Sequence, residues 1–79
     1  KTYEPEIFHL LETRLALEPV AAFLAAERAT EEQIKRLEEA HEEFIELIMQ
    51  NDPVKITLGD EAFHDLIFEA AQNPLLENL

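Results

Sequence analysis

The chain contains a single glycine, Gly59, among 79 residues, and this scarcity constrains its fold more than any other feature. Glycine and proline are the two residues that most weaken an α-helix, and long stretches rich in Ala, Leu and Glu fill the sequence instead. No segment alternates apolar and polar residues between turn signals, as a half-buried strand would. We therefore predict an all-α fold, an antiparallel helical bundle fragment of three main helices plus the start of a fourth.

Local signals place the ends of the predicted helices. Pro5 suits a first helical turn, and Pro19 should kink one continuous helix that keeps its apolar phase to about Arg28. Thr30 to Gln33 form a capping box, the clearest helix start in the chain. Asp52 is the expected N-cap before Pro53. The predicted helices span about residues 5–28, 31–50, 53–72 and 75–79.

The third helix should stop at Asn73-Pro74, because the residue before a proline avoids the helical region and asparagine tolerates a left-handed cap. Gly59 weakens this helix locally, and it leaves room for the close approach of another helix or a ligand. Apolar stripes at helical spacing are expected to face the core. They comprise Ile7, Leu10, Leu11, Leu17, Ala21, Leu24 and Ala25, then Ile34, Leu37, Phe44 and Ile48, and finally Ile56, Phe63, Ile67 and Ala70.

The net charge of the chain argues against direct binding to DNA. The formal net charge is −12, with 18 acidic residues against 6 Lys and Arg, so these residues should repel a phosphate backbone. The chain is not expected to bind DNA directly. A hydrophobic content of 47% and five phenylalanines argue for a packed core against disorder.

Length and cysteine content limit the number of domains, the oligomeric state and the location of the protein. A chain of 79 residues makes one domain, and it buries only about 60% of its unfolded surface, so a homodimer or higher oligomer is expected. There is no cysteine, no signal peptide pattern and no apolar run near the ~20 residues that span a bilayer. We expect a soluble, cytoplasmic protein with no membrane partner.

The most chemically suggestive pair is Asp60 and His64. Residues four apart on a helix are surface neighbours, so this carboxylate and this imidazole can aim at one point. A carboxylate and an imidazole turned toward a core need a hydrogen bond, an ion pair or a metal. Two interpretations stay open on the residues alone: the two side chains hydrogen-bond each other, or they bind a divalent ion such as Zn, Ni or Mn.

Arg14 and Glu18 form a second pair, on the apolar stripe of the first helix. Arg before Glu is the less favourable orientation for an ion pair within a helix, so self-stabilisation explains their placement poorly. An arginine there suits bidentate capture of a carboxylate ligand. His9 should be a surface residue, whereas His41 lies on the stripe of the second helix, as a boundary residue or a substitute metal ligand.

Taken together, four blocks of this sequence resemble a known family. The blocks are RLALEP at 14–19, LAAERAT at 24–30, DEAFH at 60–64 and EAAQNPLL at 69–76. In their order and spacing they resemble the FCD domain, the effector-binding C-terminal domain of the FadR subgroup of GntR-family bacterial transcription regulators. The resemblance covers nearly all of the chain, and it corresponds to the first half of the family's domain.

This resemblance implies a helical bundle that senses a small organic-acid effector and adjusts DNA binding by an N-terminal winged helix-turn-helix domain. It assigns Asp60 and His64 to a divalent metal, which in the family is completed by two histidines from later helices, so the metal site is expected to be incomplete here. It also places Arg14 near the ligand cavity. We predict that Arg14, Glu18 and Asn73 bind the ligand. DNA is then a partner only through a domain absent from these residues.

Two other functions compete with this one. An acidic helical module for structure or oligomerisation, with no ligand, is consistent with exposed leucines near the C-terminus. A metal hydrolase built on Asp60 and His64 lacks a third ligand, a placed base and any nucleophile motif. No catalytic residue is therefore assigned, and we do not expect an enzyme.

Overall fold

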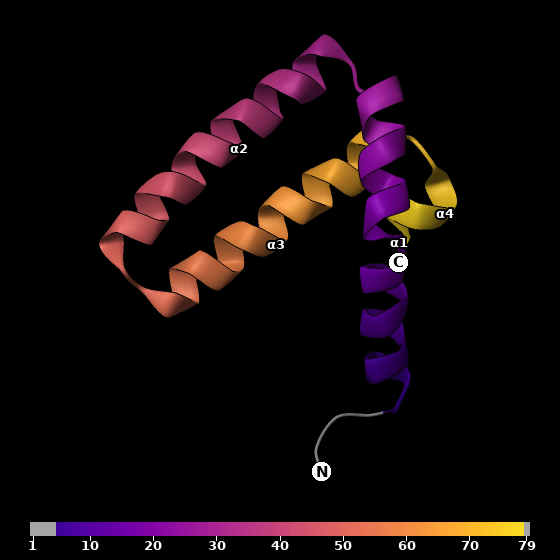
Figure 1. Ribbon diagram of the computed structural model, residues 1–79, viewed down its shortest axis with the longest axis horizontal. Coiled ribbons are helices and arrows are strands. Elements are labelled where there is room, and N and C mark those ends of the chain that lie inside the picture. Colours follow the sequence, from indigo (N-terminus) through magenta and orange to yellow (C-terminus); the bar gives the residue numbers. More distant parts are fainter. Residues whose placement is uncertain (1–4, 79) are drawn as a thin grey trace.

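The computed structural model describes residues 5–78, and every regular element in that range is an α-helix. The elements are α1 (Pro5–Arg28), α2 (Glu31–Gln50), α3 (Pro53–Ala70) and α4 (Pro74–Glu77). The helices α2 and α3 lie side by side and antiparallel, and α1 crosses the C-terminal part of α3 (Figure 1). The predicted all-α class is confirmed.

The predicted caps form as the sequence indicated. Thr30 Oγ1 accepts a hydrogen bond from the Gln33 amide at 3.1 Å, and Gln33 Oε1 accepts one from the Thr30 amide at 3.0 Å. Asp52 Oδ1 accepts from the amides of Val54 and Lys55 at 3.0 and 3.4 Å. Both helix starts therefore satisfy backbone donors that would otherwise lack a partner within the helix.

The end of α3 differs from the prediction. The helix stops at Ala70, two residues early, because Gln72 takes a left-handed backbone with φ 53°. Asn73, predicted to adopt that conformation, is extended and N-caps α4, which begins at Pro74. The residue before a proline is driven out of the helical region, and here the left-handed residue comes one position earlier. Leu79, placed in the fourth helix by the sequence, lies outside the described residues.

The first helix runs through Pro19 to Arg28 as one element, as predicted, whereas the kink expected at Pro19 stays a prediction. Proline has no N–H, so the Leu15 carbonyl loses its helical partner. The backbone there faces solvent, since Leu15 is 66% exposed, and water can satisfy that carbonyl. The apolar stripe of α1 packs only in part. Its C-terminal members Ala21 and Ala25 are buried, whereas its first three, Ile7, Leu10 and Leu11, are exposed because no described element covers that end.

The core lies where α1, α3 and α4 meet. Phe68 of α3 is 3% exposed and packs with Ala21 of α1, Ala71, and Leu76 of α4. Leu17, Leu24 and Ile67 border this cluster. Ala21 is fully buried, and its small side chain lets α1 approach α3 closely. The core therefore determines how α1 crosses α3.

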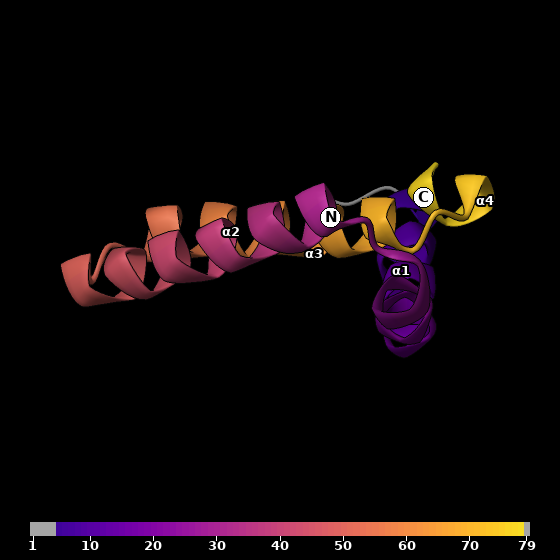
Figure 2. The ribbon, with the colours of Figure 1, turned by 90° about the horizontal axis from the view of Figure 1, so that it is seen from above.

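Most of the apolar surface lies outside this core. The structure measures 40 × 33 × 15 Å, and its thinnest dimension is little more than one helix diameter of about 10–12 Å. Figure 2 shows α2 and α3 as one layer. In this view α1 is seen nearly end-on, beside the end of the layer where α3 leads into α4. The radius of gyration is 13.8 Å, against roughly 12 Å for a compact chain of this length. An arrangement this open cannot cover both sides of its helices.

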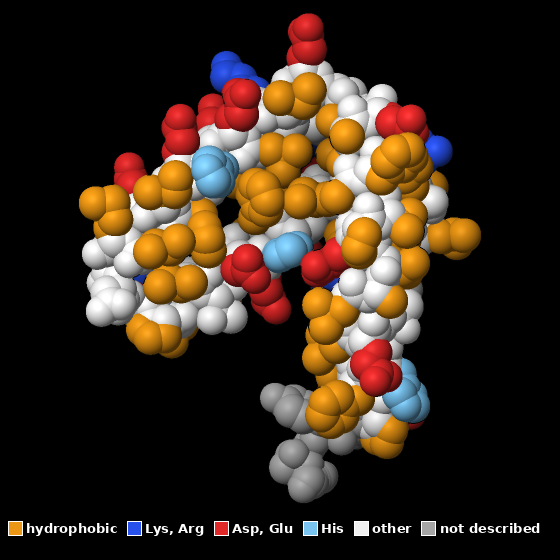
Figure 3. All heavy atoms as spheres, in the orientation of Figure 1, with side chains coloured by type: hydrophobic (Ala, Val, Ile, Leu, Met, Phe, Trp, Pro, Cys, Tyr) orange, Lys and Arg blue, Asp and Glu red, His pale blue; other side chains and the backbone are white. Residues whose placement is uncertain are grey.

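Large hydrophobic side chains are consequently exposed along α1, α2 and α3. On the face shown in Figure 3 they gather over all three helices, while acidic side chains follow the outer edge of α2. The exposed set comprises Ile7, Phe8, Leu10, Leu11, Leu15, Val20, Phe23, Ile34, Ile45, Ile48, Met49, Val54, Leu58 and Leu75. Within residues 5–78, no helix is long and apolar enough to cross a membrane.

Hydrogen bonds join the end of α1 to the turn between α3 and α4, and we call this group of contacts the polar clasp. Arg28, the last residue of α1, donates from Nη1 to the carbonyls of Ala71 and Gln72 at 3.2 and 3.5 Å. The Gln72 side chain in turn donates from Nε2 to the Arg28 carbonyl and to Gln33 Oε1. The clasp joins the end of α1, the start of α2 and the turn before α4.

Gly59 lies where α2 and α3 are close together. A Cβ at this position would lie 2.8 Å from Leu47 Cδ1 and 3.2 Å from Phe44 Cδ1. We expect Gly59→Ala to be nearly neutral, because a helix-propensity gain of about 1 kcal/mol offsets the displacement of the Leu47 methyl. Gly59→Leu should lower the free energy of unfolding by about 1–3 kcal/mol, because the larger side chain forces the helices apart.

Urea unfolding of both variants, with Ala62→Leu as the control, checks this prediction. Ala62 is an exposed residue of α3, so a leucine there should change stability by less than about 0.5 kcal/mol. Equal stability of the Gly59→Leu and Ala62→Leu variants would contradict the close approach at Gly59.

Candidate functional site

Two helices contribute the candidate site. Arg14 and Glu18 lie one turn apart on α1, and Asp60 and His64 lie one turn apart on α3. Helix geometry alone puts each pair on one face. The crossing of α1 over α3 then brings the two faces together. The site consequently combines all four of these sequence-predicted residues with one that the sequence analysis missed, Asp65.

The His64 imidazole lies between two carboxylates. Its Nδ1 is 3.3 Å from Glu18 Oε2 on α1, and its Nε2 is 3.4 Å from Asp60 Oδ1 on α3. The three side chains are partly accessible, at 33% for His64, 32% for Glu18 and 57% for Asp60. Asp60 and His64 thus lie within ion-pair distance of each other, and both interpretations, a hydrogen bond or a shared metal ion, stay predictions. The contact from Glu18 was not predicted.

Arg14 pairs with α3 and not with its own helix neighbour. Its Nη2 donates to Asp65 Oδ1 at 3.0 Å, and its guanidinium lies 5.0 Å from the centre of the Phe68 ring. The ring supports the cation while the carboxylate holds it in place. Asp65 directly follows His64 in the sequence, and that proximity to the candidate pair was the only signal that could have identified it.

The Asn73 side chain accepts hydrogen bonds from backbone amides. Its Oδ1 accepts from the amides of Leu75 and Leu76 at 3.0 and 3.4 Å, which caps the short α4. The ligand contact expected for Asn73 stays a prediction, and the described contacts of its oxygen are with the N-terminus of α4.

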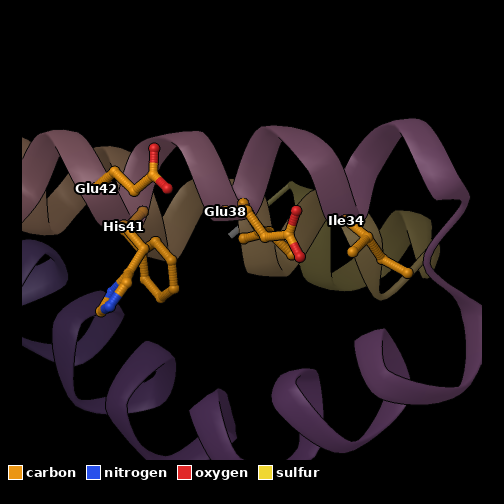
Figure 4. Close-up of a pocket in the computed structure, with 6 residues that line it drawn as sticks. Ile34, Glu38, His41 and Glu42 are labelled. Carbon is orange, nitrogen blue, oxygen red and sulfur yellow. The ribbon is translucent and has the colours of Figure 1, made fainter.

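His41 lies apart from the His64 cluster. The Phe63 ring is 6.5 Å from the His41 ring and 6.4 Å from the His64 ring, so an aromatic side chain contacts both imidazoles. Figure 4 shows His41 extending away from α2 at the edge of an open hollow, with Glu38, Glu42 and Ile34 along the same helix. His9 is exposed on α1, as predicted.

Across residues 5–78, no group of three or more His, Asp or Glu side chains could hold a metal ion. Asp60 and His64 fit as two of the ligands. Metal–ligand bonds to imidazole and carboxylate of about 2.0–2.2 Å put two tetrahedral ligands roughly 3.4 Å apart, and His64 Nε2 and Asp60 Oδ1 are 3.4 Å apart. Glu18 contacts the other ring nitrogen, where an orienting carboxylate is usual.

The charge around the site favours a cation. Glu18, Asp60 and Asp65 contribute three carboxylates, against one guanidinium from Arg14 and the imidazole of His64. An anionic metabolite approaching these residues alone would meet net negative charge. A divalent ion at Asp60 and His64 would neutralise these charges when the imidazole is uncharged, so the arrangement suits a cation.

Comparison with known proteins gives one match. The family model described as the FCD domain matches residues 9–79, which is most of the chain. No match was found among curated proteins or among solved structures. The matched range contains every residue of the candidate site.

Proposed function

Since the chain belongs to the FCD domain family, we propose that it is the effector-sensing and dimerisation part of a GntR-type bacterial transcription regulator of the FadR subgroup. The FCD domain is a regulatory domain of transcription factors and not an enzyme family. In this proposal the protein acts in the cytoplasm, and a winged helix-turn-helix domain elsewhere in the regulator contacts the DNA. The net charge of −12 supports the assignment of DNA binding to a separate domain, because the residues of this chain repel phosphate.

The proposed effector is a small carboxylate metabolite held with a divalent metal, Zn, Ni or Mn. Asp60 and His64 would supply two metal ligands, and the ion would offer open positions to a carboxylate oxygen. The observation that carries this proposal is the meeting of Asp60 and His64 on α3 with Glu18 on α1 at 3.3–3.4 Å. The Nε2–Asp60 distance suits one ion held by these two residues, with Glu18 on the opposite ring nitrogen.

Arg14 would contact the same ligand from α1. Its contact with Asp65 uses Nη2, and a guanidinium carries five N–H donors, so it can donate to a second carboxylate. Its position over the Phe68 ring keeps it close to α3. A carboxylate bound by both Arg14 and the metal would connect α1 to α3.

This bridging supplies a mechanism for sensing. The ligand would bind most tightly to one crossing geometry of α1 over α3, and it would shift the population toward that geometry. The coupling reaches DNA only if the same geometry sets the spacing of two DNA-binding domains in a dimer. The pairs Glu18–His64 and Arg14–Asp65 join α1 to α3 beside the proposed ligand, so they would help to hold the favoured geometry.

Calorimetric titration of the chain with Zn²⁺ and with Ni²⁺ tests the proposal. We expect Asp60→Ala and His64→Ala to weaken metal binding on the order of 100-fold, equivalent to about 2.7 kcal/mol. His9→Ala is the matched control, since His9 is an exposed histidine on α1 away from the cluster. Succinate, as a probe dicarboxylate, should bind only after the metal. Unchanged metal affinity in the His64→Ala variant would refute the proposed site.

A second function, an acidic helical oligomerisation module without a ligand, is favoured by the fourteen large hydrophobic side chains exposed along the helices. It predicts self-association with no change on adding metal or dicarboxylate. The same titration therefore distinguishes the two functions, because only the sensing domain loses metal affinity when Asp60 or His64 is replaced.

A further inference from the structure

Glu18 contacts the one His64 ring nitrogen that does not face Asp60. We propose that Glu18 is a positioning residue which holds His64 in the tautomer protonated on Nδ1, leaving the Nε2 lone pair directed at Asp60. Glu18 thereby takes a different role from the ligand contact expected from the sequence. The consequence for metal binding rests on the proposed function, whereas the tautomer itself does not.

The chemistry of the imidazole makes the choice of tautomer consequential. A neutral imidazole carries one N–H and one lone pair, so only one of the two carboxylates can accept a hydrogen bond from it. The other carboxylate faces a lone pair at 3.3 or 3.4 Å. That contact is unfavourable unless a water molecule or a cation beside the two groups binds both of them.

Exposure to solvent decides between the two nitrogens. The Asp60 side chain is 57% exposed and the Glu18 side chain 32%, so water can reach Asp60 more readily. The less hydrated carboxylate gains more from a direct N–H donor, because it has fewer water molecules to accept from. The proton should therefore lie on Nδ1, toward Glu18. The Nε2–Asp60 side, which is the more open one, is then free to take a cation.

The position of Glu18 gives this contact a second consequence. Glu18 belongs to α1, while His64 and Asp60 belong to α3, so the ring is oriented by a helix other than its own. A shift of α1 along α3 would remove the Glu18 carboxylate from Nδ1 and let the ring turn. Orienting carboxylates of this kind typically change metal affinity by about 10–100-fold when removed. The affinity of Asp60 and His64 for a metal ion would thus depend on the position of α1 relative to α3.

Nitrogen-15 NMR of the histidine rings tests the assignment without any metal. Above about pH 8.5, where an ordinary imidazole is neutral, we expect the wild-type His64 ring to show a protonated Nδ1 and an unprotonated Nε2. Glu18→Ala should shift the ring toward the Nε2-protonated form, and Glu18→Gln should keep Nδ1 protonated because its amide oxygen still accepts. The rings of His9 and His41 are internal controls and should not change.

Zinc titration of the same variants adds the second readout. Glu18→Ala should weaken Zn²⁺ binding by about 10–100-fold, with Glu18→Gln closer to wild type. A wild-type His64 protonated on Nε2, or a tautomer that Glu18→Ala leaves unchanged, would overturn the proposal. If the tautomer follows Glu18 but no variant binds Zn²⁺, the positioning role stands and the proposed metal function fails.

Discussion

Replacing Phe68 with alanine is expected to cost about 3–5 kcal/mol of folding stability. Phe68 is the largest side chain in the buried cluster, at 3% exposure, and it contacts α1 and α4 through Ala21 and Leu76. A 79-residue domain has only about 4–12 kcal/mol of stability in total. The variant should therefore melt about 12–40 °C lower, at about 4–8 °C per kcal/mol, or fail to fold.

Phe23→Ala is the matched control for this experiment. Phe23 is also a phenylalanine within a helix, but it is 63% exposed, so its truncation should change stability by less than about 0.5 kcal/mol. Thermal unfolding followed by far-ultraviolet circular dichroism measures both variants. Similar melting temperatures for the two would contradict the placement of the core at the meeting of α1, α3 and α4.

Self-association through the apolar face where α1, α2 and α3 meet is the second large effect we expect, as part of the proposed dimerisation role. An apolar hollow there is lined by Ala22, Ala25, Ala26, Ala29, Ile34, Leu37, Phe63 and Ile67. Ala26→Glu places a charge in this hollow, and burying an unpaired charge costs several kcal/mol. We expect the dissociation constant of the self-associated form to rise on the order of 100-fold, or about 2.7 kcal/mol.

Ala62→Glu provides the control, because it adds the same charge in a different hollow, which lies between α2 and α3 and is lined by Arg36 and Glu39. Sedimentation equilibrium should show weaker association for Ala26→Glu alone. Raising the salt concentration should strengthen association of the wild type, since screening reduces repulsion between chains that each carry a net charge of −12. A wild-type chain that stays monomeric at high concentration and high salt would rule out this interface.

The helices and their caps could be predicted from the sequence because their causes are local. The Thr30 and Asp52 caps and the continuous α1 through Pro19 all depend on residues within one or two turns of each other. The end of α3 was misplaced by two residues. Its left-handed residue is Gln72, held by side-chain contacts with Arg28 and Gln33 from distant parts of the chain.

Burial was harder to predict than helix formation. The apolar stripe of α1 has one periodicity from Ile7 to Ala25, yet only its C-terminal part is covered. Periodicity shows which side chains share a face, and the partner of that face is decided by tertiary packing. The same limit explains why Ile34 and Ile48 are exposed on α2 while Leu37 and Phe44 are half-buried.

For the candidate site, the sequence by itself determined that Asp60 adjoins His64 and that Arg14 adjoins Glu18, because residues four apart on a helix must be neighbours. Only the tertiary structure decided that Glu18 contacts His64 and that Arg14 contacts Asp65. Those contacts depend on the crossing of α1 over α3, which follows from the fit of Ala21 against Phe68. Local geometry fixes the pairs within each helix, and packing between helices brings the pairs together.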